Sequence, residues 1–398
     1  MGALAALTCL LAAAANYVVD PWGLNGFFTA DGFNARKPEP LRVARLNKAY
    51  GVLKLRPAAV AVGTSTAEHG IDMRHRAWSR SGPAFNLSFP GATISEISTM
   101  LQEAHKVSPI RLATIGLDLF SFNAHREPNA QTAEAVDVMR STLARIMPYF
   151  TRGMLGASFN TVLHQASYGP YFLPDGRSDP QAFVQWRVRM RGHHNLFAFA
   201  CRQTVRGLLA LPQRQFEFQR GKERSTLDQF RDLLDFARRS GVELRLFFSP
   251  YHVWQYETIS AIGLWPSFEY WKQQIAFIVN EYARAASGAP AVSLWDFADY
   301  SEFTSEVVPA SGDADTRLRW TWDGQHYTVE LGNLIQDRMS GIATALPHDY
   351  GIKIDAWNVN AHLLAVRARQ QRYRASHPRE VAEVQKIAAE TLRSLQAP

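Results

Sequence analysis

The hydrophobic pattern from residue 57 onward alternates between two periods. Short apolar or alternating runs, of the kind that form strands buried in a parallel sheet, occur at residues 58–65, 84–91, 111–122, 242–250 and 291–297. Apolar residues recur at helical spacing over residues 94–107, 133–147, 227–241 and 268–287. Strands that alternate with helices predict an α/β fold, with a central parallel sheet covered by helices on both faces.

The first 19 residues carry no charged side chain and are mostly small and apolar. Their number is close to the roughly 20 residues that a helix needs to cross a bilayer, and Tyr17 and Trp22 stand where interfacial aromatic residues are expected. We therefore predict a transmembrane helix, an uncleaved anchor, with the rest of the chain exported. A cleaved signal peptide, cut near residues 13–15, and a buried helix of a soluble protein are the alternatives.

Domain boundaries follow changes in composition and periodicity. The predicted organisation is a membrane anchor at 1–20, a connector at 21–56, an α/β domain at 57–345 with a helical insertion at 151–224, and a C-terminal helical extension at 346–398. The connector prediction depends on a stretch rich in Gly, Pro and Asn. The insertion interrupts the α/β rhythm with a loop-like stretch and a basic helical region, and the extension includes a polar helix at 376–395.

Basic residues concentrate in the insertion, at Arg187, Arg189, Arg191, Arg202 and Arg206. Such a run is usually a solvated helix face, but beside a membrane anchor it has a second interpretation, contact with anionic lipid or an acidic glycan. The formal net charge of +7 over 398 residues agrees with an anionic partner without selecting one. Zinc-finger spacing and aromatic–basic RNA-binding patterns are missing, so nucleic acid is not an expected partner.

Metal, cofactor and disulfide chemistry are not expected. Cys9 and Cys201 are the two cysteines, and neither has a nearby partner in the sequence, which argues against a disulfide framework and a cysteine-based metal site. His193 and His194 are adjacent, and adjacent residues of a helix point in different directions, so they do not make a metal-binding pair.

Two polar motifs stand beside the predicted strands and helices. Ser65 ends the run "AAVAVGTS" in a tight turn, and Asp323 precedes His326 by three positions just before a predicted helix. A carboxylate at that spacing holds one imidazole nitrogen and leaves the other free as a base. Because ligands bind at the carboxyl ends of parallel strands, Ser65, His326 and Asp323 are the candidate nucleophile, base and orienting residue. In the alternative, Ser65 only caps the helix that follows its strand.

These motifs resemble those of the SGNH/GDSL hydrolase-like superfamily over roughly residues 57–342. Gly63-Thr64-Ser65 matches the first block of the family, and Gly91 in "NLSFPGAT" matches the glycine of the second block. Asp-x-x-His at positions 323–326 matches the last block. The resemblance implies a three-layer domain in which the N–H groups of Gly91 and Ser65 form the oxyanion hole.

The resemblance is closest to the divergent, membrane-anchored branch of this superfamily, which includes proteins similar to the periplasmic alginate O-acetylation proteins and the teichoic-acid D-alanylation protein. It implies a protein anchored in the inner membrane, with the bulk of the chain in the periplasm. The implied reaction is acyl transfer or ester hydrolysis on a cell-envelope or exported polysaccharide. The implied partners are the polysaccharide, an acyl donor and a membrane-bound acyltransferase that supplies activated acyl groups.

Two positions depart from the family pattern. Thr64 stands where the first block has Asp, and Asp118 ends the strand where the third block normally supplies an Asn side chain to the oxyanion hole. Asn86 and Asn123 are the candidates to replace that donor. Asp118, Asn123 and His252, all near predicted strand ends, are the candidates to line the pocket.

Two other functions fit the same residues. An ionised Asp118 would repel an oxyanion, which favours a catalytically inactive glycan-binding or assembly subunit of a polysaccharide modification or export system. Gly63-x-Ser65-x-Ala67 also nearly matches the nucleophile elbow of an α/β-hydrolase. That interpretation ranks last, because the serine follows the first strand rather than a later one.

Overall fold

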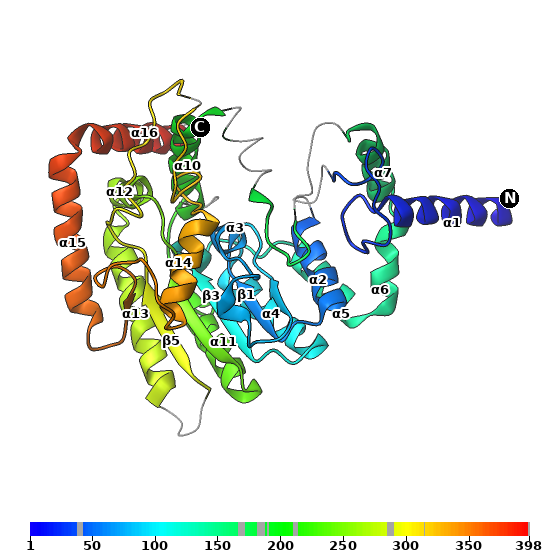
Figure 1. Ribbon diagram of the computed structural model, residues 1–398, viewed down its shortest axis with the longest axis horizontal. Helices are drawn as coiled ribbons and strands as arrows, with labels where there is room; N and C mark the ends of the chain where they lie inside the picture. The colour runs from blue at the N-terminus through cyan, green and yellow to red at the C-terminus, as the bar shows by residue number, and fades with distance from the viewer. Residues whose placement is uncertain are drawn as a thin grey trace.

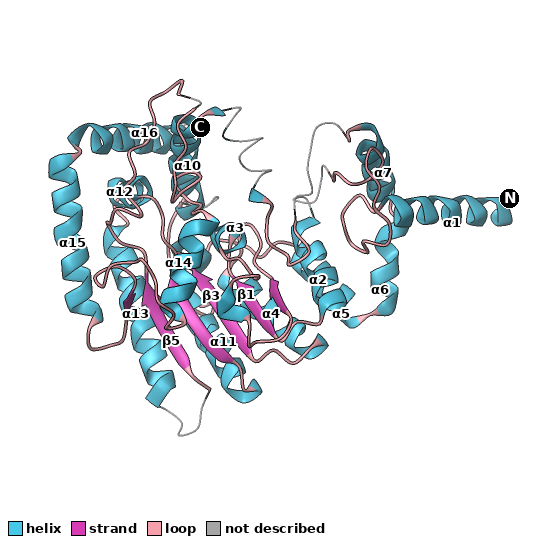
Figure 2. Cartoon of the chain, in the orientation of Figure 1, coloured by secondary structure: helices cyan, strands magenta, loops and turns pink. Residues whose placement is uncertain are grey.

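The structure, a computed structural model, describes residues 1–37, 43–165, 172–180, 188, 191–209, 214–284, 290–313 and 315–396. Over these residues the chain forms an α/β fold around a six-stranded sheet, drawn in magenta in Figure 2. The strands, in their order across the sheet, are β2 (Ala84–Asn86), β1 (Ala59–Val62), β3 (Leu112–Leu117), β4 (Glu243–Phe248), β5 (Val292–Asp296) and β6 (Ile352–Lys353). The first five are parallel, and β6 is antiparallel to β5.

Helices cover both faces of the sheet (Figure 1). One face carries α3 (Ser65–Gly70) and α14 (Val329–Met339), and the other carries α4 (Ile94–Val107), α11 (Thr226–Ser240) and α13 (Trp265–Arg284). Successive side chains of a strand point to opposite faces. In β1, Ala59 and Ala61 therefore pack with α3 and α14, and Val60 and Val62 pack on the opposite face.

The predicted α/β fold is confirmed, with one correction to the sheet. Each of the five predicted strands contains an observed strand, shorter by a few residues. Strand β6 was not predicted, because two residues are too few to show a period, and it makes the sheet mixed rather than purely parallel. Further elements are η2 (Arg76–Trp78), η3 (Leu119–Phe122), α10 (His193–Leu208) and α12 (Val253–Ala261).

The segment 21–56, predicted as a connector, contains a helix that belongs to the α/β domain. Helix α2 (Ala44–Leu55) packs against α5 (Gln131–Arg140). Its buried face carries Lys48, whose Nζ lies 3.2 Å from Glu68 Oε1 in α3, and both side chains are fully buried. A buried face with polar residues does not produce the apolar period of an ordinary amphipathic helix, so the sequence pattern did not reveal α2.

Helix α1 (Gly2–Val19) projects from the domain at the right of Figure 1. By length and composition it is apolar and long enough to span a membrane, and 17% of it is buried. At its base it packs against η4 (Met147–Phe150) and α7 (Arg152–Leu163), which follow α6 (Thr142–Ile146). Most of the predicted anchor therefore stands clear of the domain.

The segment predicted as a C-terminal helical extension begins inside the domain, because it contains strand β6 of the sheet. The rest of it forms two helices, α15 (Val359–Ser376) and α16 (Pro378–Gln396), which pack on the domain. A buried polar cluster joins α15 to the sheet. Asp296 Oδ2, at the end of β5, lies 2.7 Å from Lys272 Nζ in α13 and 3.0 Å from His362 Nε2 in α15. Burial alone would raise the pKa of Asp296, but these two partners outweigh it and lower that pKa.

Replacing Lys272 by Met is expected to lower the free energy of unfolding by about 3–5 kcal/mol, because the Asp296 charge stays buried without its ammonium partner. Denaturant unfolding followed by circular dichroism measures the loss. Lys386→Met, at an exposed position of α16, is the matched control and is expected to change stability by less than about 0.5 kcal/mol. Equal effects of the two substitutions would contradict a stabilising role for the buried cluster.

Candidate active site

Ser65 stands at the carboxyl edge of the sheet, directly after strand β1. Thr64 caps α3 by accepting a hydrogen bond from the Thr66 N–H, and Ser65 is the first residue of that helix. The chain passes from β1 to β2 on one side and then to β3 on the other, so Ser65 lies where the strand order reverses. In open α/β sheets this is the place where ligands bind.

The segment from Asp323 to His326 is a tight turn stabilised by its own polar groups. Asp323 Oδ1 accepts hydrogen bonds from the backbone N–H groups of Gln325 (2.7 Å) and His326 (2.9 Å). Thr321 and Tyr327 pair across the turn in an isolated antiparallel bridge. The backbone of the turn therefore holds the carboxylate next to the imidazole ring.

Ser65, His326 and Asp323 form a continuous hydrogen-bonded chain. His326 Nδ1 lies 2.9 Å from Asp323 Oδ2, and His326 Nε2 lies 2.9 Å from Ser65 Oγ. Burial alone would raise the pKa of Asp323, but the charge of His326 and the hydrogen bonds from its ring and from the turn outweigh it and lower that pKa. The Asp323 carboxylate is thus ionised at neutral pH. It holds the Nδ1 proton and leaves Nε2 to accept a proton from Ser65.

Close packing of two helices sets the distance between Ser65 and His326. Gly70 is the last residue of α3, and a Cβ on Gly332 in α14 would lie 1.8 Å from the Gly70 carbonyl oxygen. A Cβ on Gly70 would in turn lie 1.8 Å from the Tyr327 ring. These two glycines therefore let α3, which begins with Ser65, press against the segment that follows His326.

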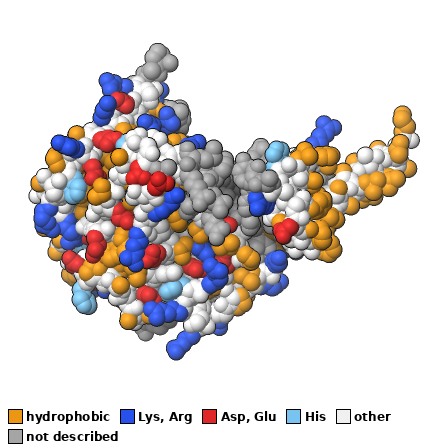
Figure 3. Space-filling model, turned by 45° about the horizontal axis from the view of Figure 1, so that its top comes forward, with side chains coloured by type: hydrophobic (Ala, Val, Ile, Leu, Met, Phe, Trp, Pro, Cys, Tyr) orange, Lys and Arg blue, Asp and Glu red, His pale blue; other side chains and the backbone are white. Residues whose placement is uncertain are grey.

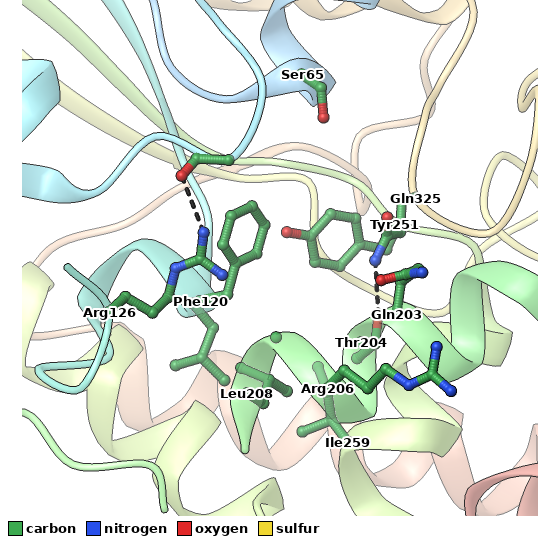
Figure 4. A pocket seen from close by; sticks show the side chains of 13 residues that line it. Ser65, Phe120, Arg126, Gln203, Thr204, Arg206, Leu208, Tyr251, Ile259 and Gln325 are labelled. Carbon is green, nitrogen blue, oxygen red and sulfur yellow. Dashed lines mark hydrogen bonds between the residues drawn. The ribbon is translucent and has the colours of Figure 1, made fainter. Parts of the chain in front are cut away.

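The Ser65 hydroxyl points into a pocket of about 370 Å³ (Figure 4). Its apolar lining comes from η3, α10 and α12, and its polar lining comes from α10 and from residues next to β4 and in the Asp323 turn. The apolar residues are Leu119, Phe120, Leu208 and Ile259, and the polar residues are Gln203, Thr204, Arg206, Tyr251 and Gln325, together with Arg126 from the loop after η3. Helix α10 lies in the predicted insertion, which therefore supplies one wall of the pocket.

Most of these lining residues were not predicted from the sequence. Tyr251 offered a signal, because it follows β4 at the carboxyl edge of the sheet. Residues of α10 offered none beyond the basic run that includes Arg206, since their place beside Ser65 arises only from the tertiary fold. Within that run, Arg187 and Arg189 lie outside the described residues.

Gly91 also lines the pocket, with a backbone φ of +66° that favours glycine. Its carbonyl oxygen accepts a hydrogen bond from Arg126 Nη2 at 2.9 Å, which fixes the orientation of that part of the loop. Neither the Gly91 N–H nor the Ser65 N–H donates a hydrogen bond to another described residue. Because neither N–H group has a partner among the described residues, both are available as the kind of donor that an oxyanion hole requires.

Asp118 holds the turn that carries Ser65 instead of lining the pocket, which corrects the expectation from the sequence. Its Oδ2 accepts hydrogen bonds from Thr64 Oγ1 (2.5 Å) and Thr66 Oγ1 (3.0 Å), and its Oδ1 accepts one from the Tyr251 hydroxyl (2.8 Å). Burial outweighs these hydrogen bonds and raises the pKa of Asp118. Asp118 therefore contributes to the pocket only through the residues that it holds.

Asn86 and Asn123, the two candidates to replace the missing oxyanion donor, donate their side-chain hydrogen bonds to backbone carbonyl groups. Asn86 Nδ2 donates to the carbonyl oxygens of Ala67 (3.0 Å) and Ile71 (3.1 Å), just beyond Ser65 in the chain. Asn123 Nδ2 donates to the carbonyl oxygen of Leu208 at 2.9 Å. Neither side chain lines the pocket, so the oxyanion role expected of Asn86 and the pocket role expected of Asn123 are corrected. Both amides stabilise loops around the site.

His252 is also a structural residue and does not line the pocket. Its Nδ1 accepts a hydrogen bond from the Trp254 N–H at the start of α12, and its Nε2 donates to the Glu306 carbonyl oxygen at 2.8 Å. Burial lowers the pKa of His252 to about 4. The ring is therefore neutral at pH 7, which is the form that both hydrogen bonds require.

His193 and His194 point to different partners. His193 Nδ1 lies 3.0 Å from the Trp322 carbonyl oxygen, and His194 Nε2 lies 2.8 Å from Glu383 Oε1. Within the part of the chain that the structure describes, no three His, Cys, Asp or Glu side chains are grouped so that they could hold a metal ion. His193 instead ties α10, which forms the pocket wall, to the loop before Asp323.

Comparison with known proteins gives no assignment. No protein-family model and no curated protein matches the chain. A functional assignment therefore depends on the geometry of the site and on the motifs that the sequence contains.

Replacing His252 by Asn is expected to weaken the pH dependence of stability. Because the folded-state pKa of about 4 is below the unfolded value of about 6.5, the unfolded state takes up the proton first. The contribution of the neutral His252 ring to the free energy of unfolding is then fully present above about pH 6.5 and falls as the pH drops toward 4. Asn caps the helix without titrating, so the variant should lose about 3 kcal/mol less over this range. Equal losses in urea unfolding at several pH values would refute this role.

Replacing Gly332 by Ala is expected to lower the free energy of unfolding by about 1–3 kcal/mol, because the new methyl group collides with the backbone of Gly70. Denaturant unfolding measures the difference. Gly156→Ala in α7, where a Cβ meets nothing within 4 Å, is the matched control and is expected to be neutral or slightly stabilising. A Gly332→Ala variant as stable as wild type would show that α3 and α14 are not closely packed.

Proposed function

We propose that the protein is a membrane-anchored serine O-acyltransferase or esterase of the SGNH type that acts on a cell-envelope or exported polysaccharide. The observation that carries the proposal is the hydrogen-bonded chain of Asp323, His326 and Ser65, which opens into a pocket at the reversal of strand order. Helix α1 would anchor the protein in the inner membrane, with the bulk of the chain in the periplasm. A membrane-bound acyltransferase is the partner that would deliver the acyl group.

The geometry supports a two-step acyl transfer. In the first step, Ser65 Oγ attacks the carbonyl carbon of an acyl ester while His326 Nε2 takes the hydroxyl proton. Asp323 stabilises the imidazolium ion, and the N–H groups of Ser65 and Gly91 stabilise the oxyanion. His326 then returns the proton to the leaving alcohol. In the second step, a sugar hydroxyl or water attacks the acyl-serine in the same way, and Ser65 regains its proton.

Thr64 and Asp118, the two residues that depart from the family pattern, are hydrogen-bonded to each other. Thr64, in the place of the first-block Asp, donates its hydroxyl proton to Asp118, in the place of the third-block Asn. The carboxylate faces hydroxyl groups and does not line the pocket, so repulsion of an oxyanion by Asp118 is weaker than the sequence alone suggested. Two backbone donors then carry the oxyanion hole, without the third donor of the family, which is expected to cost about 10²–10³ in rate.

The pocket suits a small acyl group next to a polar acceptor. Leu119, Phe120 and Ile259 offer an apolar surface for an acyl chain. On the polar wall, Arg206 is exposed at the pocket and supplies positive charge where an acidic glycan would approach. The resemblance to envelope-polysaccharide acylation proteins and the apolar helix α1 support the same class of substrate.

Ser65→Ala and Asp323→Asn are expected to lower the turnover of 4-nitrophenyl acetate by at least about 10³-fold, because one removes the nucleophile and the other the charge that orients His326. Nitrophenolate release by the full chain in detergent measures the rate. Ser88→Ala is the matched control, since this buried serine lies outside the pocket and its hydroxyl has no hydrogen-bond partner among the described residues. It should retain wild-type turnover.

Wild-type turnover no faster than that of a correctly folded Ser65→Ala variant would contradict the catalytic proposal. The glycan-binding or assembly subunit would then be the better function, because it needs the pocket without the chemistry. Loss of activity in Ser88→Ala as well would indicate general damage to the fold and would equally fail to support the triad.

A further inference from the structure

The helices at the base of α1 turn apolar side chains outward. Those on α6 and η4 follow the spacing i, i+3, i+4, i+7, which places them on one helical face. Leu143 there is 68% exposed, and Leu163 on α7 is 75% exposed. The exposed set, called the collar below, is Leu143, Ile146, Met147, Phe150, Phe159 and Leu163.

Helix α7 exposes large apolar side chains that a helix on a water-exposed surface normally buries. Its buried side carries Met154 and Ala157 together with Ser158, whose hydroxyl donates to Asn16 Oδ1 at 2.8 Å. On its outer side, Phe159 is 65% exposed. Helix α11 has the ordinary arrangement, with Phe230 buried and Arg231 exposed. Exposed apolar residues that occur singly need no explanation, but a contiguous group on neighbouring helices marks an interaction surface.

The collar lies alongside the apolar helix rather than beyond its polar end. Asn16 of α1 donates to the Tyr149 carbonyl oxygen in η4 and accepts a hydrogen bond from Ser158 in α7. The buried residues of α1 are Ala13, Asn16 and Val19. They precede Asp20, so the collar covers the last seven or so residues of the apolar stretch, a length of about 10 Å. Figure 3 shows the hydrophobic surface of the projecting α1 continuing onto the adjoining part of the domain.

The charge of this region suits a membrane surface. Residues 141–165, which contain the whole collar, include no Asp or Glu but include Arg145 and Arg152. Helices that lie in the interface of a bilayer have their apolar face about 5–10 Å deep, with basic residues near anionic headgroups. The length of about 10 Å over which the collar lies beside α1 therefore agrees with the depth expected of such interfacial helices.

We propose that the collar inserts into the headgroup–acyl boundary of an anionic lipid bilayer, so that α6, η4 and α7 lie in the membrane surface around the base of α1. The occupant of the collar is lipid and not a second protein. This inference depends on the anchor in the proposed function and not on the acyl-transfer chemistry. It gives the domain a fixed attachment to the membrane in place of a single flexible tether.

Fluorescence quenching by lipid-attached doxyl groups tests the proposal in the full chain. Cys9→Ser removes the exposed cysteine, and Cys201 is fully buried, so a single cysteine introduced at Phe159 or Leu143 takes an environment-sensitive dye. Leu364→Cys is the matched control, since Leu364 is 63% exposed and belongs to α15, the helix at the end of the molecule opposite α1 (Figure 1). The proteins are reconstituted in vesicles of phosphatidylcholine and phosphatidylglycerol, and circular dichroism checks their fold.

Labels at positions 143 and 159 are expected to shift to the blue and to lose most of their fluorescence to doxyl groups near the headgroup, while the label at 364 is unchanged. Equal quenching at 143, 159 and 364 would overturn the proposal, as would labels at 143 and 159 that stay in water, the result expected of a protein-docking surface. A label on the native Cys9 separates the two claims. Deep quenching there without quenching at 159 retains the anchor but refutes the collar.

Discussion

The close contact between α3 and α14 is the constraint on which the candidate site depends. Ser65 and His326 are 261 positions apart, yet Gly70 and Gly332 let their helices approach until Ser65 Oγ lies 2.9 Å from His326 Nε2. Lengthening this hydrogen bond by a few tenths of an ångström would weaken it. Ser65 follows β1, where the strand order of the sheet reverses. This hydrogen bond therefore lies at the edge of the sheet where ligands bind.

Buried polar groups hold the turn that carries Ser65 from within the domain. Lys48 in α2 pairs with Glu68 in α3, and Asp118 accepts hydrogen bonds from the hydroxyls of Thr64 and Thr66 on either side of Ser65. In a low-dielectric interior such contacts are strong and directional, and leaving them unsatisfied is costly. The turn that presents Ser65 is therefore restricted to one conformation before any substrate binds.

The features that the sequence predicted well are those with local causes. The strands follow from runs of adjacent apolar residues, and Asp323 meets His326 because three positions of one turn separate them. Asn86 and Asn123 were misassigned because the partner of a buried amide depends on which carbonyl group the tertiary fold brings close. Helix α2 was missed because its buried face carries Lys48. The pocket wall formed by α10 likewise comes from a segment far from Ser65 in the sequence, and no local sequence pattern predicts its position.

The most direct test of the central claim is covalent capture of the nucleophile. The full chain is treated with a fluorophosphonate, which forms a phosphorus–oxygen bond with an activated serine and releases fluoride, and the modified peptide is identified by mass spectrometry. One adduct is expected, on Ser65, and it should be lost in a folded His326→Ala variant, because the imidazole is what activates that serine. An adduct on another serine, or a Ser65 that stays unmodified in the wild type, would contradict the assignment.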